Sequence, residues 1–114
     1  MKLSNRSKRK RIRNGKNCVV YEYPMKDKII NGAIAEISGR YPEKGHALNR
    51  ACNELVYVLN GNGNAFVRNK EVKLKTGDMI LIEKKEKFYW DGKMTLFMSC
   101  VPSWSPKQYV ITDK

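Results

Sequence analysis

Apolar and polar residues alternate over short segments along most of this 114-residue chain, a pattern typical of β-strands that bury one face in a sheet. The clearest such segments are CVVYEY at 18–23, NELVYVLN at 53–60, MILIE at 79–83 and MTLFMSCV at 94–101. Glycine, proline, asparagine and aspartate punctuate the intervals between them, and no segment has the period of a long helix. The pattern predicts an all-β fold, an antiparallel sandwich or barrel, with one more strand in the C-terminal tail.

Two glycine-containing segments indicate where tight turns should fall. Asn60-Gly61-Asn62-Gly63 and Asp91-Gly92 both have the composition of two-residue hairpin turns. We therefore expect a strand to end at each of them. Residues 46–55, HALNRACNEL, are compatible with a loop or with a short helical turn.

The charge is unevenly distributed. The net charge is +12, and residues 1–16 hold eight of the 23 Lys and Arg without a single acid. Repulsion and the lack of apolar residues to bury predict a flexible basic arm at residues 1–17, followed by one domain at residues 18–114. The arm would contact nucleic acid or another anion non-specifically, or serve only as a solvated tail. The residues expected to make such contacts are Lys8, Arg9, Lys10, Arg11 and Arg13.

The cysteines and the hydropathy suggest a compartment. Cys18, Cys52 and Cys100 are odd in number and have no CxxC spacing, which favours a reducing environment and a cytoplasmic location over a disulfide framework. No apolar run approaches the ~20 residues that span a bilayer, and no apolar stretch follows the basic start as in a secretory signal. We expect no transmembrane segment.

Glu54 lies at the start of an otherwise apolar strand. Since side chains alternate along a strand, Glu54, Val56 and Val58 share one face. The other face is apolar too, which predicts a barrel interior on one side and a second sheet or a second subunit on the other, hence a homodimer. A buried carboxylate at a barrel mouth requires a cationic, hydrogen-bonding or metal partner.

Three segments resemble those of small single-domain cupins. They are NELVYVLNGNGNAF at 53–66, LKTGDMILIE at 74–83 and CVPSW at 100–104, and the resemblance extends over roughly residues 29–110. It implies a double-stranded β-helix, the RmlC-like jelly-roll barrel, which is often dimeric and has its site inside the barrel. Glu54-x6-Gly61 fits the second half of the first cupin motif, and Gly77-Asp78 fits the start of the second.

The metal-binding positions of that family are mostly occupied by other residues here. The two histidines of the first motif would fall on Ala47 and Asn49, or on Leu48 and Arg50. The histidine of the second motif is replaced by Phe88, so that Glu54 alone remains of the four usual ligands. The resemblance thus implies a barrel without a transition metal or another cofactor. An atypical shell of His46, Cys52 and Glu54 in a metal-dependent enzyme, of the dioxygenase or isomerase sort, is the alternative.

An aromatic wall would then stand where the metal site is lost. If Phe88 points inward, Trp90 does so as well, because the two are separated by one residue. The predicted ligand-binding residues are Asn49, Cys52, Glu54, Phe88 and Trp90. Aromatic faces beside a few polar groups suit a carbohydrate or a planar organic molecule, although such rings also simply fill small barrels.

Three functions follow from these features. The first is metal-independent binding of a small molecule, with a carbohydrate as one candidate. The others are the metal-dependent enzyme described above and a non-enzymatic dimeric protein that binds nucleic acid through its basic arm. The sequence leaves open whether the chain catalyses any reaction.

Overall fold

The computed structural model describes residues 1–112, and this part of the chain contains nine strands and two short 3-10 turns. The strands are β1 (Lys10–Arg13), β2 (Cys18–Tyr23), β3 (Asn31–Ser38), β4 (His46–Asn49), β5 (Asn53–Val67), β6 (Lys70–Lys75), β7 (Met79–Ile82), β8 (Lys87–Val101) and β9 (Tyr109–Thr112). The 3-10 turns are η1 (Arg6–Lys8) and η2 (Pro106–Gln108). All strand pairs are antiparallel, and β9 is the strand expected in the tail.

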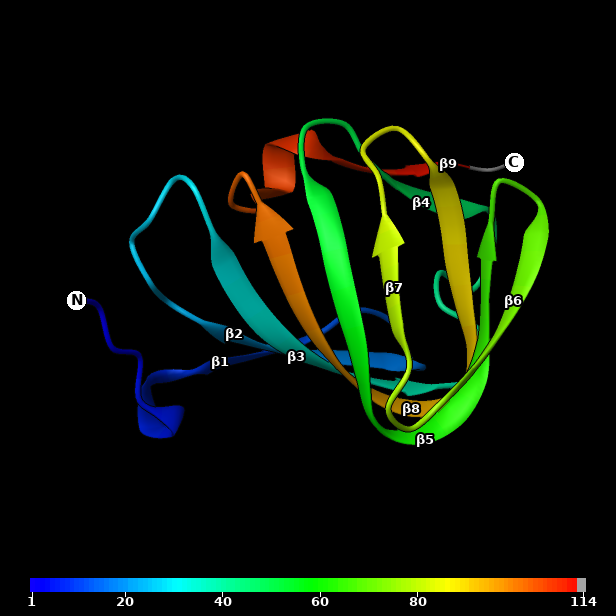
Figure 1. Ribbon diagram of the computed structural model, residues 1–114, viewed down its shortest axis with the longest axis horizontal. Coiled ribbons are helices and arrows are strands. Elements are labelled where there is room, and N and C mark those ends of the chain that lie inside the picture. The colour runs from blue at the N-terminus through cyan, green and yellow to red at the C-terminus, as the bar shows by residue number, and fades with distance from the viewer. Residues whose placement is uncertain (113–114) are drawn as a thin grey trace.

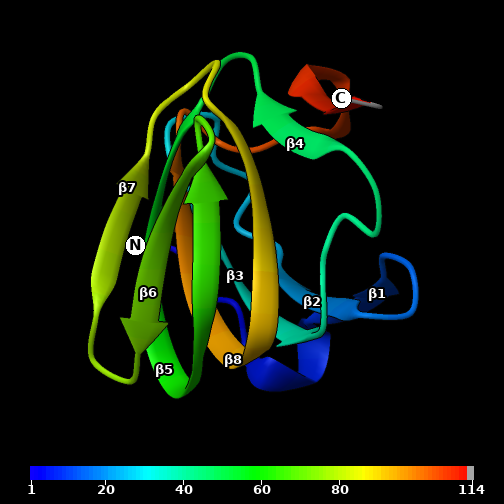
Figure 2. The ribbon, with the colours of Figure 1, turned by 90° about the vertical axis from the view of Figure 1, so that its right-hand side faces the viewer.

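Two long strands, β5 and β8, hold the barrel together. They pair with each other along almost their whole length and bend so that each belongs to two layers (Figure 1). In the first layer the order is β1-β2-β3-β8-β5-β7, and in the second it is β9-β4-β8-β5-β6. Figure 2 shows β5, β6 and β7 along one side of this curled sheet and β1, β2 and β4 on the opposite side. This is the jelly-roll barrel that the strand pattern and the cupin resemblance predict.

The glycine-rich segments do not form hairpin turns, and that prediction is wrong. Both lie inside continuous strands, where Gly63 of β5 pairs with Gly92 of β8 at the bend. Gly92 has φ +135°, and a Cβ there would lie 2.5 Å from the Cα of Gly63. Facing glycines let the two backbones approach closely and twist sharply, so the same residues that favour a turn also favour a strand bend.

The expectation of a separate arm at residues 1–17 requires correction. Lys10–Arg13 form β1, which pairs with β2, with Ile12 directly opposite Val20. The edge of β2 offers unpaired backbone groups, and the alternation of Ile12 with arginines matches the two faces of an added strand. Residues 46–49 likewise form a strand, β4, and not a helical turn.

The core fills the space between the two layers. Its most deeply buried side chains come from the inward positions of β3, β5 and β8, among them Ala35, Val56, Val58, Trp90 and Leu96. Buried residues alternate with more exposed ones over residues 53–58 of β5, which fixes the register there, since a slip of one residue would move these apolar side chains to the wrong face. Within residues 1–112 no helix is long and apolar enough to cross a membrane.

Candidate functional site

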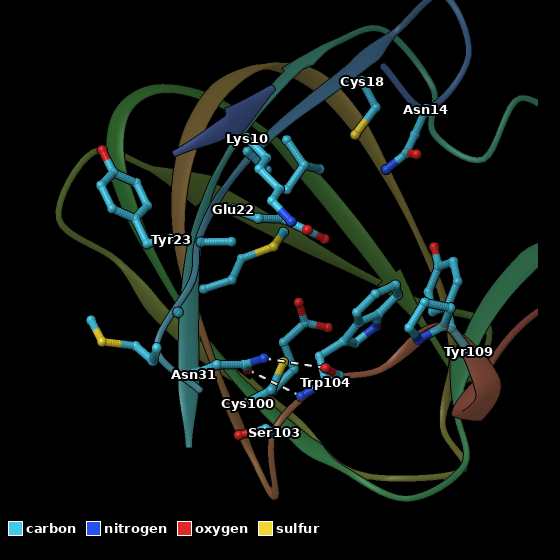
Figure 3. A pocket seen from close by; sticks show the side chains of 18 of the residues that line it. Lys10, Asn14, Cys18, Glu22, Tyr23, Asn31, Cys100, Ser103, Trp104 and Tyr109 are labelled. Atoms are coloured by element: carbon cyan, nitrogen blue, oxygen red, sulfur yellow. Dashed lines mark hydrogen bonds between the residues drawn. The ribbon is translucent and has the colours of Figure 1, made fainter. Parts of the chain in front are cut away.

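A cavity of about 440 Å³ lies within the barrel, and its lining includes residues of the N-terminal strands and of the C-terminal segment. Figure 3 shows Lys10, Asn14 and Cys18 on one side of it and Asn31, Cys100 and Trp104 on the other. The lining is mostly apolar and aromatic, with a small number of polar groups, as is usual for sites that bind organic molecules.

Glu54 lines this cavity from the start of β5 and is 7% exposed. Its Oε1 accepts a hydrogen bond from Asn49 Nδ2 at 3.0 Å, and no hydrogen bond to Oε2 is found among the described residues. Burial raises the pKa of the Glu54 carboxyl from 4.5 to about 7, although the bond from Asn49 opposes this increase. Near neutral pH the group can therefore both donate and accept a proton.

A chain of buried amides holds Glu54 in place. Gln108 Nε2 donates to Asn49 Oδ1 at 2.9 Å, and Gln108 Oε1 accepts from the Ala51 N–H at 3.1 Å and from the Cys52 thiol at 3.5 Å. These contacts orient the Asn49 amide so that its NH₂ group faces the carboxylate. Asn49 and Cys52, predicted as ligand-binding residues, are fully buried behind Glu54 and are not among the residues that line the cavity.

Phe88 and Trp90 both point into the barrel, as the alternation along their strand predicts. They line the cavity and meet edge to face, with ring centroids 6.0 Å apart. Phe88 lies opposite Ala47 of β4. The two rings thus form an apolar wall of the cavity and contribute to the core as well.

Two tyrosines that the sequence did not single out line the cavity together with Trp104, the last residue of the CVPSW segment. The hydroxyls of Tyr41 and Tyr109 lie 2.9 Å apart, and burial raises the pKa of both, so each keeps its proton and can donate a hydrogen bond. Trp104 packs against Tyr109, and its backbone N–H and C=O are bound by the side chain of Asn31 at 3.0 and 3.2 Å. These residues come from a loop and from the tail, where no periodicity indicates which way a side chain points.

The structure does not assemble the alternative shell of His46, Cys52 and Glu54. Ala47 and Asn49 are buried on β4, whereas His46 lies on the opposite face. There its ring meets the ring of Tyr89 edge to face, with the ring centroids 5.5 Å apart. Among residues 1–112 no three His, Cys, Asp or Glu side chains lie close enough to hold a metal ion. The donor set does not fit the metal centre of the cupin motifs.

The basic residues near the N-terminus separate into two groups. Lys10 lines the cavity. The Arg9 guanidinium stacks on the ring of Tyr21 at 3.9 Å, and Arg11 lies directly opposite Tyr21 on β2. Arg13, two residues along the strand, shares this outer face, while Lys8 belongs to η1. One segment thus contributes both to the cavity and to an outer basic surface.

Comparison with known proteins identifies the fold of this chain. No protein-family model and no curated protein matches the chain. Among solved structures, Pac13 from Streptomyces, a nucleoside dehydratase also crystallised with uridine, superimposes with a TM-score of 0.88 at 14% identity, covering 97% of this chain and 90% of Pac13. An RmlC-like cupin from Shewanella frigidimarina has a TM-score of 0.72 at 12% identity, over 88% of this chain and 89% of that one. The chain has the cupin fold.

A similar fold also matches part of a much longer enzyme. Salicylate 1,2-dioxygenase from Pseudoaminobacter salicylatoxidans matches with a TM-score of 0.66 at 14% identity, over 75% of this chain and 27% of the dioxygenase. The fold resemblance suspected from Glu54-x6-Gly61 and the Gly77-Asp78 turn is thereby confirmed.

Proposed function

We propose that this cupin binds, without a metal, a small molecule that joins a planar ring to a hydroxylated moiety, such as a nucleoside. The observation that supports this most directly is a proton-exchanging carboxyl, Glu54, at the wall of a 440 Å³ cavity that also presents aromatic faces. Phe88, Trp90 and Trp104 offer surfaces for a ring, and Glu54 and the tyrosine hydroxyls offer partners for sugar hydroxyls. The uridine complex of the structurally similar Pac13 supports this class of ligand.

The chemistry available in such a complex is proton transfer. Glu54, with its pKa near 7, is suited to act as a general acid or base, because efficient proton transfer requires a pKa close to the working pH. Tyr41 and Tyr109 remain protonated and stabilise a developing negative charge as hydrogen-bond donors. Any reaction in this cavity would use Glu54 for proton transfer and Tyr41 and Tyr109 as hydrogen-bond donors.

Titration calorimetry with uridine, ribose and uracil, each with and without a chelator, tests this proposal. We expect uridine to bind more tightly than either fragment, with no effect of the chelator. Glu54→Gln keeps the shape of the side chain and should weaken uridine binding roughly 10- to 100-fold, the range for losing a hydrogen bond to an ionisable group. Glu36→Gln, at an exposed position of β3, is the control and should bind normally. Binding that requires metal, or equal affinity in Glu54→Gln, contradicts the proposal.

A second candidate, binding of nucleic acid, is favoured by the arrangement of β1. Arg9, Arg11 and Arg13 lie on one outer face, and residues 1–16 contain no acid to neutralise them. We propose that this face contacts phosphates of nucleic acid without sequence preference. This candidate depends on the charge and position of the three arginines and not on the cavity.

Fluorescence anisotropy with a mixed-sequence DNA duplex, measured over a range of salt concentrations, tests this second candidate. Replacing Arg9, Arg11 and Arg13 by serine should reduce the slope of log affinity against log salt by about 3, since each phosphate contact contributes roughly 0.9. Replacing Lys70, Lys73 and Lys84 by serine removes the same charge elsewhere and should change the slope much less. Equal effects of the two triple variants would show that only the net charge matters.

A further inference from the structure

Two cysteine side chains meet at the wall of the cavity beside Glu54. Cys100, near the end of β8, lies directly opposite Glu54, and Cys52 immediately precedes β5. The alternation that exposes Asn53 and Val101 turns the two thiols inward, where both are buried. The Cys100 thiol donates a hydrogen bond to the sulfur of Cys52, so the two sulfurs are neighbours within the barrel.

The two thiols differ in their access to the cavity. Cys100 is one of the lining side chains shown in Figure 3, whereas Cys52 is fully buried and is not among them. The Cys52 S–H instead donates to Gln108 Oε1 at 3.5 Å. A small molecule in the cavity therefore meets Cys100 first.

The hydrogen bond between the sulfurs makes the pair more reactive than a single buried thiol. This bond lowers the pKa of Cys52, although burial opposes the change, and the same bond together with burial raises the pKa of Cys100. The pair therefore releases one proton at Cys52 and keeps the other between the two sulfurs. Transfer of the remaining proton to Cys52 moves the negative charge to Cys100, which faces the cavity. The thiolate is the form that reacts with oxidants.

The third cysteine, Cys18, provides an internal reference. It also lines the cavity and is buried, and this burial raises its pKa to about 12. Cys18 lies opposite Ile37, which lies opposite Met94, six residues from Cys100 along β8. A rise of about 3.3 Å per residue puts roughly 20 Å between these positions, whereas the Cα atoms of a disulfide lie about 4.4–6.8 Å apart. Cys18 is thus a buried thiol that has no other thiol within reach.

We propose that Cys52 and Cys100 form a reversible disulfide when a small peroxide enters the cavity. The Cys100 sulfur takes one oxygen from hydrogen peroxide, whose O–O bond breaks, and becomes a sulfenic acid. The Cys52 thiolate then attacks that sulfur, so that the S–S bond forms and hydroxide leaves. In total the two thiols lose two electrons and two protons, and the peroxide is reduced to two molecules of water. A small thiol such as glutathione restores the pair by exchange.

The disulfide changes the surroundings of Glu54. Once oxidised, Cys52 has no proton to donate to Gln108, whose amide holds Asn49 against the Glu54 carboxyl. Disulfides that form in a reducing compartment are usually transient and serve catalysis or redox sensing, so the pair is compatible with an odd number of cysteines. The proposal does not depend on the identity of the cavity ligand.

Thiol titration and peptide mapping of the full chain, before and after treatment with hydrogen peroxide, test the proposal. The reduced chain has three free thiols. Peroxide should leave only that of Cys18, and dithiothreitol should restore the other two. Mass spectrometry of an unreduced tryptic digest should show the peptide of Cys52 joined to that of Cys100, and a non-reducing gel should show no linked chains.

Two matched variants identify the role of each thiol. Cys52→Ser removes the partner thiol and should slow the loss of the Cys100 thiol several-fold. Cys18→Ser removes a buried thiol of the same cavity and should form the disulfide at the unmodified rate. If Cys52→Ser does not fold, the peptide map of the unmodified chain still decides which cysteines pair.

Other outcomes would overturn the proposal. Three thiols that survive peroxide, equal loss of Cys18 and of the pair, or a disulfide between chains would each do so. Loss of the Cys100 thiol at the unmodified rate in Cys52→Ser would also contradict it, because the reaction would then not need the second sulfur.

Discussion

At the scale of single residues, the site depends on how one carboxyl is buried. Within the described part of the chain Glu54 has a single hydrogen bond, from Asn49, and that amide is itself held by Gln108. One neutral donor does not compensate for the loss of hydration, and for this reason the pKa of Glu54 increases toward 7. A carboxyl with a cationic partner would have the opposite shift and would be unsuited to proton exchange near neutral pH.

This pKa predicts how stability depends on pH. Below pH 4.5 Glu54 is protonated in both states; between pH 4.5 and about 7 the unfolded state loses its proton while the folded state keeps it. Stability therefore falls as the pH rises through this window and then levels off. Glu54→Gln should match the unmodified chain below pH 4.5 and be more stable by about 3 kcal/mol above pH 7, by urea unfolding. Glu36→Gln should show no such pH-dependent gain, and a gain of equal size at all pH values would contradict the burial argument.

At the scale of elements, the alternation of residues predicted the strands well but not where they end. The pattern at 53–60 correctly placed Glu54 and Val56 on one inner face, because the period of two has a single physical meaning in a half-buried strand. The Asn-Gly pairs were misinterpreted because glycine permits both a hairpin turn and a close approach of two strands. Gln108 was missed because its contact with Asn49 links residues 59 positions apart, and nothing local announces such a contact.

The bend between β5 and β8 predicts a costly substitution. Gly92→Ala combines a φ of +135° with a Cβ that would approach the Gly63 Cα to 2.5 Å, whereas Gly77→Ala has a φ of +95° and no atom within 4 Å of the added Cβ. We expect Gly77→Ala to lower the free energy of unfolding by about 1 kcal/mol and Gly92→Ala by about 3 kcal/mol or more, as measured by urea unfolding. Equal losses of stability in the two variants would mean that β5 and β8 can separate at the bend at little cost.

At the scale of the whole molecule, the cavity combines segments that are distant in sequence. Lys10 comes from β1, Glu54 from β5, Trp90 from β8 and Tyr109 from β9. A strand pattern predicts the barrel and the inward parity of Glu54 and Trp90, but it does not place an N-terminal strand or a C-terminal tail against them. The excess of basic residues made the first 17 residues resemble a solvated arm, although Ile12 opposite Val20 shows that charge and strand pairing are compatible.

The charge of the whole molecule leads to a prediction about salt. The ion pairs found within residues 1–112 are Lys2–Asp27, Arg68–Glu86 and Lys75–Asp78. They are solvent-accessible and contribute little to the stability of the fold. Salt therefore weakens little attraction, while it screens the repulsion among the charges of a +12 chain. The melting temperature should therefore rise by a few degrees between low and moderate sodium chloride concentrations, a range in which the Debye length falls from about 30 Å to about 8 Å. Replacing Arg9, Arg11 and Arg13 by serine lowers the charge from +12 to +9 and should make this rise smaller, as followed by scanning calorimetry. A melting temperature that falls with salt would instead indicate that ion pairing, and not the apolar core of the barrel, dominates the stability of the fold.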